Sequence, residues 1–307
     1  MSPVSVPPVL IVGSMAFDDL QLPSTTATDV IGGAATYASL ATSLFAPARI
    51  VAIVGSDFPE STLEDLRRRD INTDGVWRAD GKTFRWSGRY SHNLSSRQTL
   101  DTQLNVFADF RPVLPDAYRD SQFVLLANIH PALQLEVLDQ VSAPRYVAAD
   151  TMNFWIEKER PTLERVLSRI DTLVINDEEL RQLAGEHNLK KAARTTRSLG
   201  PKRLIVKRGE YGAMLFDDRG LFFAPAYPLD EEIDPTGAGD TFAGALLGTL
   251  ASQGDIGPHA LRRALLTASS VASFCVEDVG TRRLQNLSAG DATARLDSLQ
   301  SLVKLDA

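Results

Sequence analysis

The chain has 307 residues, of which 44% are hydrophobic and 23% are charged, so it can bury a large core and lies near the upper limit for one domain. Its net charge of −7, without a long basic run, argues against nucleic acid and anionic membranes as partners. A single cysteine, Cys275, excludes an internal disulfide and a cysteine-based metal site. A start without a signal pattern, and the lack of a run of about 18 apolar residues, predict a cytoplasmic protein.

The first predicted element is a buried strand over residues 9–13, an apolar run that ends in glycine. Adjacent Asp18 and Asp19 follow it, and the carboxyl end of a strand in an open α/β sheet is where ligands usually bind. The two acids are therefore candidates for binding hydroxyl groups, although acids in a loop are also often just solvated. Gly32 and Gly33 then precede a helical stretch, where a glycine pair lets a ligand approach the backbone closely.

The pattern changes in the next segment of the chain. A second buried strand is expected over residues 49–54, and a charged surface helix follows it. Residues 76–107 are instead rich in aromatic and β-branched residues, carry turn signals and show no helical period. This pattern predicts inserted antiparallel strands, which form either a lid or dimerisation sheet or an extension of the main sheet's edge.

From residue 122 onward, strands alternate with helices, which predicts a parallel sheet with right-handed crossovers. Three strands end in polar residues that we expect along one rim of the sheet: Asn128, Asp150 and Asn176. Asn176 and Glu179 also fit a helix cap with an acidic first turn, and a cap at the rim would still face the crevice.

Two basic residues and two glycines follow the strand expected over residues 203–206. Lys207 and Arg208 add positive charge at the strand end, and Gly209 and Gly212 allow a tight turn. Two cations beside a glycine turn suit a polyphosphate, while a solvated basic turn fits the same residues.

Residues 234–251 read as a glycine-rich loop that leads into an apolar helix. The first amides of such a helix have no intrahelical acceptor and lie at the positive end of the helix dipole, so they can bind an anion. Asp240 is the side chain in that first turn that can take a proton. The combination indicates phosphoryl transfer, with a capped helix stabilised by its own aspartate as the alternative.

The chain resembles the ribokinase-like, or PfkB, carbohydrate and nucleoside kinases over nearly its whole length. The motifs that carry the resemblance are Asp234-Pro235-Thr236-Gly237-Ala238-Gly239-Asp240, the pair Gly32-Gly33, the pair Asn176 and Glu179, and the glycines Gly209 and Gly212. The resemblance implies a three-layer α/β sandwich in a single domain over residues 1–307, with a mostly parallel central sheet. It also implies a small antiparallel β lid formed by about 15–31 and 74–108.

The resemblance also implies roles for individual residues at the phosphate end. Asp240 would deprotonate the accepting hydroxyl, and the amides of Gly237, Ala238 and Gly239 would form an anion hole. The implied ATP-binding residues are Asn176, Lys207, Gly209, Gly212, Gly237, Gly239 and Ala268, the last of these beside the adenine. Asn176 and Glu179 would organise Mg²⁺, partly through water, and a K⁺ site near Asp234 and Thr236 is a candidate.

At the substrate end, Asp18 matches the family's acid that binds sugar hydroxyls, and Gly33 matches the backbone position that the substrate touches. Gly32 and Asn128 complete the expected substrate site together with Asp240. After the glycine pair the chain departs from the ribokinase pattern, because Tyr37 replaces an amide that holds the sugar. The pocket is therefore expected to differ from that of a ribokinase.

We expect an ATP-dependent kinase that phosphorylates a hydroxyl of a monosaccharide or polyol. A nucleoside kinase of the same fold is the alternative enzyme, and an inactive ligand-binding sensor is the alternative from another class. A homodimer through the lid sheet is a further expectation from the resemblance. The aromatic lid residues Phe84, Trp86 and Tyr90 fit either stacking on a substrate or packing within the lid.

Overall fold

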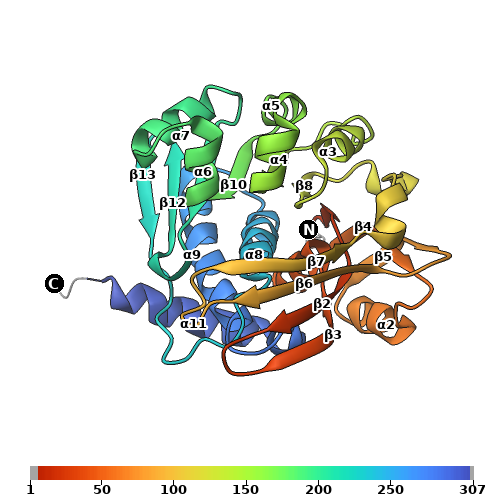
Figure 1. The fold of residues 1–307 in the computed structure, drawn as a ribbon. Helices are drawn as coiled ribbons and strands as arrows, with labels where there is room; N and C mark the ends of the chain where they lie inside the picture. The colour runs from red at the N-terminus through yellow and green to blue at the C-terminus, as the bar shows by residue number, and fades with distance from the viewer. Residues whose placement is uncertain (1–5, 305–307) are drawn as a thin grey trace, which may run out of the picture.

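The computed structural model describes residues 6–304; residues 1–5 and 305–307, the ends of the expected single domain, lie outside the described residues. Its centre is a nine-stranded sheet with helices on both faces (Figure 1). From one edge to the other, the strands are β13 (Gly220–Ala224), β12 (Ala213–Asp217), β11 (Arg203–Lys207), β10 (Thr172–Asn176), β9 (Tyr146–Asp150), β8 (Phe123–Leu126), β1 (Val9–Val12), β4 (Ala48–Gly55) and β5 (Ile71–Ala79).

The strands from β11 to β5 all run parallel, whereas β12 and β13 form an antiparallel edge. The carboxyl ends of the parallel strands therefore meet at the same edge of the sheet. This arrangement confirms the mostly parallel central sheet, and it brings the polar residues that follow these strands to one rim.

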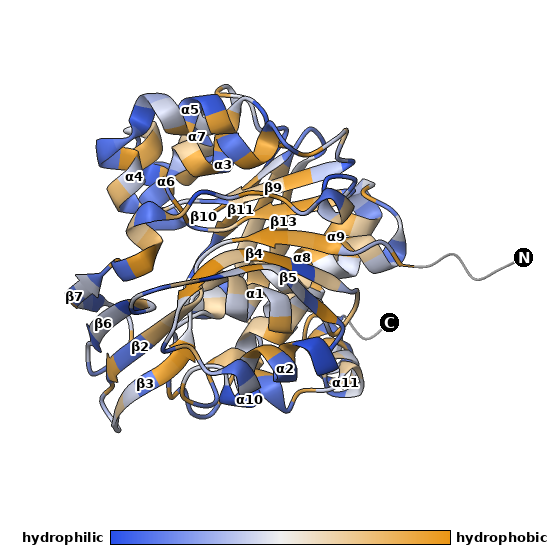
Figure 2. Cartoon of the chain, turned by 90° about the vertical axis from the view of Figure 1, so that its right-hand side faces the viewer, coloured by the Kyte–Doolittle hydropathy of each residue, from blue (hydrophilic) through white to orange (hydrophobic). Residues whose placement is uncertain are grey.

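Side chains alternate between the two faces of the sheet, because successive residues of a strand point in opposite directions. Val9 and Ile11 join one hydrophobic core, while Leu10 and Val12 join the other. Helices α1 (Ala34–Thr42), α2 (Glu60–Arg68), α8 (Ala238–Gln253), α9 (Pro258–Cys275), α10 (Arg282–Gln285) and α11 (Ala289–Leu302) contribute to the first core. Helices α3 (Pro131–Leu138), α4 (Asn153–Lys158), α5 (Arg160–Leu167), α6 (Asp177–Ala184) and α7 (Leu189–Arg197) contribute to the second. Figure 2 shows the two helical layers, which complete a three-layer sandwich.

A second sheet of four strands projects from the carboxyl edge of the large sheet (Figure 1). Its order is β3 (Thr26–Gly32), β2 (Ala16–Gln21), β6 (Phe84–Tyr90) and β7 (Arg97–Gln103). The pairs β2–β3 and β6–β7 are antiparallel, but β2 and β6 pair in parallel. The small sheet is therefore mixed rather than purely antiparallel.

The second segment of the small sheet begins at Phe84, later than the expected boundary near residue 74. Residues 71–79 form β5, which pairs in parallel with β4 at the edge of the large sheet. The burial alternates along the start of β5, with Ile71, Thr73 and Gly75 facing inward. Both readings of the inserted segment thus hold for a part of it: its first strand extends the large sheet, and the later strands form the small sheet.

Between residues 6 and 304, no helix is both long and apolar enough to cross a membrane. Helix α7 and strand β13 have no counterpart in the elements expected from the sequence. Helix α7 carries Lys and Arg on most of its surface and buries only Ala192, Ala193 and Thr196, so its apolar pattern is weak.

Candidate active site

Helix α8 begins at the glycine-rich loop, with Gly237 as its N-terminal cap at φ 76°. A methyl group on Gly237 would lie 2.4 Å from ring carbons of Tyr37, so the loop packs directly on that ring. The amide of Ala238 donates to the carbonyl of Pro235 at 3.2 Å. Ala238 is one of the three residues whose amides are expected to form the anion hole, and its amide therefore already has an acceptor. Asp240 lies in the first helical turn, as the sequence predicts.

A largely buried ion pair lies beside this helix start. The Nζ of Lys207, at the end of β11, is 3.0 Å from the Oδ2 of Asp150, at the end of β9. The same Nζ is 2.9 Å from the position that a methyl group on Gly239 would occupy, so the ammonium lies against the first turn of α8. A fixed positive charge and a helix N-terminus therefore converge on one spot, which suits an anion.

The pKa of the Asp240 carboxyl is raised to about 7. Burial is the main cause and the charge of Asp150 adds to it, while Lys207 and Arg97 lower the pKa. Arg97 belongs to β7 of the small sheet, so a cation from the far side of the crevice acts on the same carboxyl. A carboxyl with a pKa near neutrality can both accept and release a proton under physiological conditions.

Asn176 and Glu179 form a reciprocal capping box at the start of α6. The Glu179 amide donates to Asn176 Oδ1 at 2.8 Å, and the Asn176 amide donates to Glu179 Oε2 at 3.1 Å. Burial, together with the charge of Asp150, raises the pKa of Glu179 to about 7. The cap reading of these two residues is thus correct, and their position at the end of β10 also brings them to the rim of the large sheet.

At the other end of the crevice, Asp18 lies against the glycine pair. Its Oδ2 is 1.9 Å from the position that a methyl group on Gly32 would occupy, so a side chain there would displace the Asp18 carboxyl. Burial, with the charges of Asp234, Asp240 and Asp19 adding to it, raises the pKa of Asp18 to about 8. Such a carboxyl becomes a stable anion only where hydrogen-bond donors reach it, and sugar hydroxyls are donors of that kind.

Gly33 and Tyr37 complete this end of the site on helix α1. Gly33 caps the helix at φ 93°, and a methyl group there would lie 2.5 Å from the carbonyl oxygen of Ser14. Tyr37 is almost completely buried, and its hydroxyl has no hydrogen-bond partner within the described part of the chain. Burial raises the pKa of Tyr37 well above its usual value, and the nearby Asp18 adds to the shift. Tyr37 is therefore a neutral phenol beneath the start of α8.

Asp234 and Thr236 brace the loop that precedes α8. The two oxygens of the buried Asp234 carboxylate accept the amides of Thr236 at 2.9 Å and Gly280 at 2.8 Å. The Thr236 hydroxyl lies 2.9 Å from the hydroxyl of Tyr90, which links the small sheet to the loop. Each Asp234 oxygen thus has one acceptor position occupied, and main-chain carbonyl groups near this loop are further oxygens that a cation could use.

Three expected site residues have surroundings that the sequence does not reveal. Gly209 opens a short turn at φ 53° with free space around it, whereas Gly212 packs tightly against the carbonyl of Ala224. Ala268 is completely buried in α9 and offers no accessible surface to an adenine ring in this structure. Asn128 accepts a hydrogen bond from Trp155 Nε1 at 3.0 Å, and its own amide group is 3.3 Å from the sulfur of Met152.

The aromatic residues expected to stack from the small sheet are occupied in packing. Phe84 contacts Phe107 with ring centroids 5.4 Å apart, Trp86 donates to the Thr99 hydroxyl at 3.3 Å, and Tyr90 bonds to Thr236. The roles of Asp150 and Arg97 were not predicted, because both act across long distances in the sequence. Asp150 had one signal, its position at a strand end among polar neighbours.

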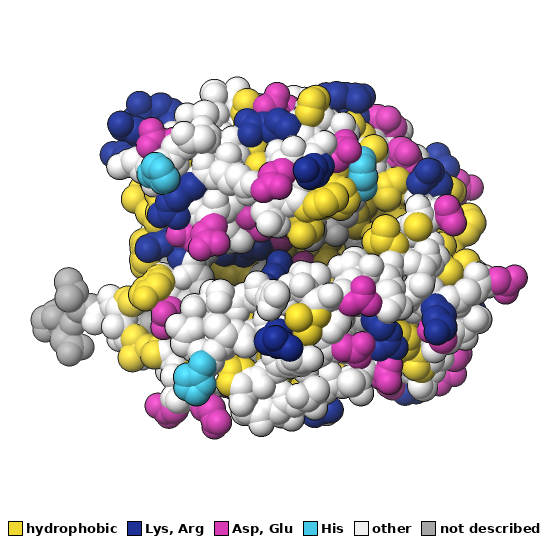
Figure 3. Space-filling view, in the orientation of Figure 1, with side chains coloured by type: hydrophobic (Ala, Val, Ile, Leu, Met, Phe, Trp, Pro, Cys, Tyr) yellow, Lys and Arg dark blue, Asp and Glu magenta, His cyan; other side chains and the backbone are white. Residues whose placement is uncertain are grey.

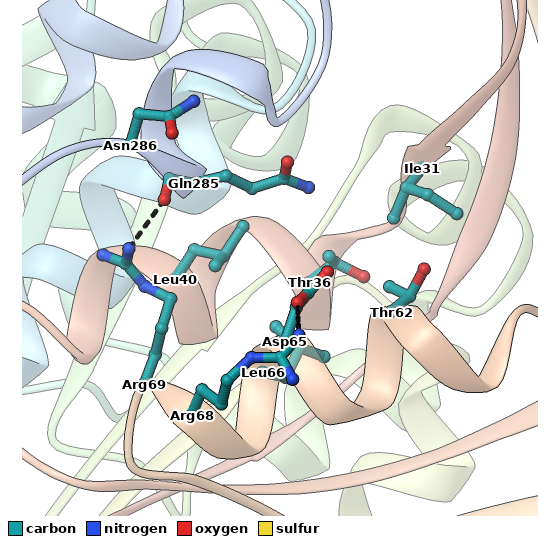
Figure 4. A pocket seen from close by; sticks show the side chains of 10 residues that line it. All are labelled: Ile31, Thr36, Leu40, Thr62, Asp65, Leu66, Arg68, Arg69, Gln285 and Asn286. Carbon is teal, nitrogen blue, oxygen red and sulfur yellow. Dashed lines mark hydrogen bonds and ion pairs between the residues drawn. The ribbon is translucent and has the colours of Figure 1, made fainter.

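The crevice between the helices at the carboxyl edge of the large sheet and the small sheet is open in Figure 3, with charged side chains of both signs around it. A separate cavity of about 300 Å³ lies between α1, α2 and α10 (Figure 4). Its lining includes Thr36, Arg69 and Gln285 but none of the residues expected in the site. We therefore assign the site to the crevice, where the helix start, the ion pair and the carboxyls converge.

A helix N-terminus with a buried ammonium and carboxyls of raised pKa is typical of enzymes that bind and transfer phosphoryl groups. Comparison with known proteins assigns the chain within that class. Residues 7–287 match the family model described as pfkB family carbohydrate kinase, and the chain belongs to that family. The expected kinase activity is confirmed at the level of the family.

Individual relatives agree with this assignment. A cytidine kinase of Thermococcus kodakarensis is 28% identical over 244 residues, which are 78% of this chain and 87% of that protein. An aminoimidazole riboside kinase of Salmonella typhimurium is 40% identical over 101 residues, or 33% of this chain and 30% of that protein. The ribokinase of Arabidopsis thaliana, solved with ribose and ATP, superimposes with a TM-score of 0.77 at 21% identity, covering 95% of this chain and 99% of that one. The ribokinase-like fold is thus confirmed.

Proposed function

We propose that the protein transfers the γ-phosphoryl group of ATP to a hydroxyl of a sugar or of the sugar part of a nucleoside, in the crevice at the carboxyl edge of the large sheet. The observation that carries this proposal is the position of Asp240. Its carboxyl lies in the first turn of α8, with a pKa raised to about 7, and Lys207 lies against the same turn. A base and an anion-binding helix start in one turn are what phosphoryl transfer to a hydroxyl requires.

In the proposed reaction, the oxygen of the substrate hydroxyl attacks the γ-phosphorus, and the Asp240 carboxylate accepts the proton of that hydroxyl. The new O–P bond of the phosphate ester forms as the bond between the γ-phosphorus and the bridging oxygen breaks, and ADP leaves with that oxygen. The first amides of α8, around Gly237 and Gly239, donate to the phosphoryl oxygens, and the Lys207 ammonium lies beside them. These groups are fixed before the reaction, so they stabilise the spread negative charge of the transition state without reorganising.

The nucleotide phosphates would extend from α8 toward the turn at Gly209, which is open to solvent, and past Asn176. Glu179 and Asn176 offer the oxygen donors that Mg²⁺ prefers, and burial and the charge of Asp150 raise the pKa of Glu179, so a bound cation would stabilise its anion. When bound, Mg²⁺ would supply neutralisation of phosphate charge, mainly through water and phosphate oxygens. For K⁺, the main-chain carbonyls near Asp234 and Thr236 are the donors we propose.

The accepting sugar would lie at the opposite end, over Gly32 and Gly33. The Asp18 carboxyl would accept hydrogen bonds from sugar hydroxyls, which would favour its ionised form despite its burial. The charge of Asp240 contributes to the raised pKa of Asp18, so the two ends of the crevice are electrostatically coupled. Tyr37 lies beneath Gly237, and at this position of the motif the resemblance implies an amide in ribokinases.

Strand β7 is an exposed edge strand along its whole length and presents unpaired backbone groups. We therefore propose a homodimer through the small sheet. Sedimentation at several concentrations would contradict this if only monomer were found.

An ATP-dependent reaction also fits the expected cytoplasmic location, which cell fractionation tests.

The role of Asp240 is tested with Asp240→Asn, which keeps the shape of the side chain but removes the base. We expect kcat to fall by about 10²-fold or more, while ATP binding measured by calorimetry is kept. Asp297→Asn, in an exposed position of α11, is the matched control and should leave kcat unchanged. Unchanged turnover in Asp240→Asn would overturn the assignment and would favour a site without a protein base.

A further inference from the structure

Three aromatic side chains form a cluster at the rim of the crevice. We define the rim cluster as His130, Phe154 and Trp155. The ring centroids of Phe154 and Trp155 are 4.9 Å apart, and the two rings meet edge to face at 81°. The ring centroid of His130 is also 4.9 Å from that of Trp155. Phe154 is 49% exposed, so its ring is accessible to a ligand.

The rim cluster is held in place by polar contacts rather than by burial in the core. Helix α4 has six residues, and Ile156 is the one that it buries. Trp155 Nε1 donates to Asn128 Oδ1 at 3.0 Å, which fixes the indole ring. His130 caps α3, with its Nδ1 accepting the Ala132 amide at 3.1 Å, so this imidazole presents a fixed face. The Trp155 and His130 rings are therefore held in place, and Phe154 packs edge to face on the Trp155 ring.

The rim cluster follows strands β8 and β9, which lie between the strand that leads to Asp18 and the strands that lead to the phosphate end. Asn128 follows β8, and β8 lies between β1, whose chain continues to Asp18, and β9, which ends at Asp150. Met152, two residues after Asp150, contacts the Asn128 amide group. In Figures 1 and 2, α4 stands across the open crevice from strands β6 and β7. A substrate whose sugar reached Asp18 would thus have its outer substituent beside α4.

An exposed aromatic surface beside a sugar site matches a planar heterocycle attached to the sugar. A free monosaccharide offers no such ring, whereas each nucleobase has a face that stacks on aromatic side chains. In the small sheet, Tyr90 is buried, Phe84 packs on Phe107, and the Arg97 guanidinium lies over the Trp86 ring, whereas the Phe154 ring is exposed. The cytidine kinase and the aminoimidazole riboside kinase among the relatives both have names that denote a sugar with an attached base.

We propose that the substrate is a nucleoside and that its base stacks on the rim cluster, with Phe154 as the principal contact. This inference rests on the proposed function and narrows its substrate class from sugars in general to sugars that carry a base. It makes Phe154 a residue that determines specificity through the Michaelis constant, since stacking on a base contributes to substrate binding rather than to the transfer step.

The test uses the full chain with ATP and Mg²⁺, and it compares cytidine, uridine, adenosine and guanosine with free ribose. We expect at least one nucleoside to have a KM about tenfold or more below that of ribose. Phe154→Ala should raise that KM about tenfold and leave kcat nearly unchanged, and Phe154→Tyr should restore stacking and the low KM. Trp77→Ala, equally exposed at 49% on the edge strand β5, is the matched control and should leave KM unchanged.

Binding separates the failure of this inference from the failure of the proposed function. Calorimetry of the best-bound nucleoside, without ATP, should show about tenfold weaker binding to Phe154→Ala than to wild type. If no acceptor is phosphorylated but this binding difference is present, the proposed kinase reaction fails and the base site stands. If ribose is phosphorylated as efficiently as every nucleoside, or if Phe154→Ala binds and turns over nucleosides like wild type, the inference is overturned and the kinase reaction stands.

Discussion

Gly237 begins helix α8 in a conformation and a position that an alanine cannot share, so Gly237→Ala should destabilise the protein. Its φ of 76° costs a residue with a side chain roughly 1–2 kcal/mol. The added methyl would also lie 2.4 Å from Tyr37 ring carbons, and forcing an extra carbon into a packed region costs roughly 1–3 kcal/mol. We therefore expect the free energy of unfolding to fall by about 2–5 kcal/mol.

Gly254, at the other end of the same helix, is the matched control. Its φ is 60°, but a methyl group there would meet no atom within 4 Å. Gly254→Ala should therefore carry the conformational cost alone, about 1–2 kcal/mol. Urea unfolding of both variants, followed by circular dichroism, gives the difference that is due to contact with Tyr37.

A double-mutant cycle with Tyr37→Ala identifies the contact directly. Removing the ring should relieve the overlap, so the loss caused by Gly237→Ala should shrink by at least about 1 kcal/mol in the Tyr37→Ala background. Equal losses for Gly237→Ala and Gly254→Ala, or a cycle without coupling, would refute the reasoning that Tyr37 packs against the start of α8.

Three further variants test the electrostatics of the crevice. Because Arg97 lowers the pKa of Asp240, Arg97→Gln should move the acid limb of the kcat/KM profile to higher pH, and an unmoved limb would count against a contribution of the small sheet. Lys207→Met leaves the Asp150 carboxylate buried without its partner, so the free energy of unfolding should fall by about 3 kcal/mol. The KM for ATP should also rise, and a stable variant with a normal KM would contradict the role assigned to Lys207. Tyr90→Phe removes the hydroxyl contact to Thr236 and should cost about 1 kcal/mol in urea unfolding, whereas no loss would show that the link between small sheet and loop is not stabilising.

The architecture follows from the sequence to a large extent because it depends on local patterns. Short apolar runs that end in polar or glycine residues predicted the strands β1, β8, β9 and β10, and the helices between them made a parallel sheet the expected arrangement. The capping box of Asn176 and Glu179 was also readable, since its two hydrogen bonds join residues three apart.

Boundaries were harder to predict where two strands share the same composition. Strand β5 and strand β6 both carry aromatic residues, and the segment between them has turn signals. Only the pairing partner decides that β5 joins the large sheet and β6 the small one, and pairing is a long-range property. The parallel pairing of β2 with β6 had no local signal for the same reason.

The remaining features of the candidate site depend on contacts between distant parts of the chain. The ion pair of Lys207 with Asp150 joins residues 57 positions apart, and the contact of Trp155 with Asn128 joins residues 27 apart. Neither the burial of Ala268 nor the exposure of Phe154 can be read from residue type, because each depends on what packs over the helix. Such contacts, at both ends of the crevice, therefore lie beyond what the sequence alone predicts.

The most direct test of the central claim is a search for the phosphorylated product. The purified chain is incubated with ATP, Mg²⁺ and the panel of sugars, polyols and nucleosides, and the products are analysed by mass spectrometry with Asp240→Asn as the control. We predict a monophosphate ester of at least one acceptor, formed together with ADP and absent or greatly reduced with Asp240→Asn. An equal yield from Asp240→Asn, or no phosphorylated acceptor in the panel, would contradict phosphoryl transfer by Asp240 in this crevice.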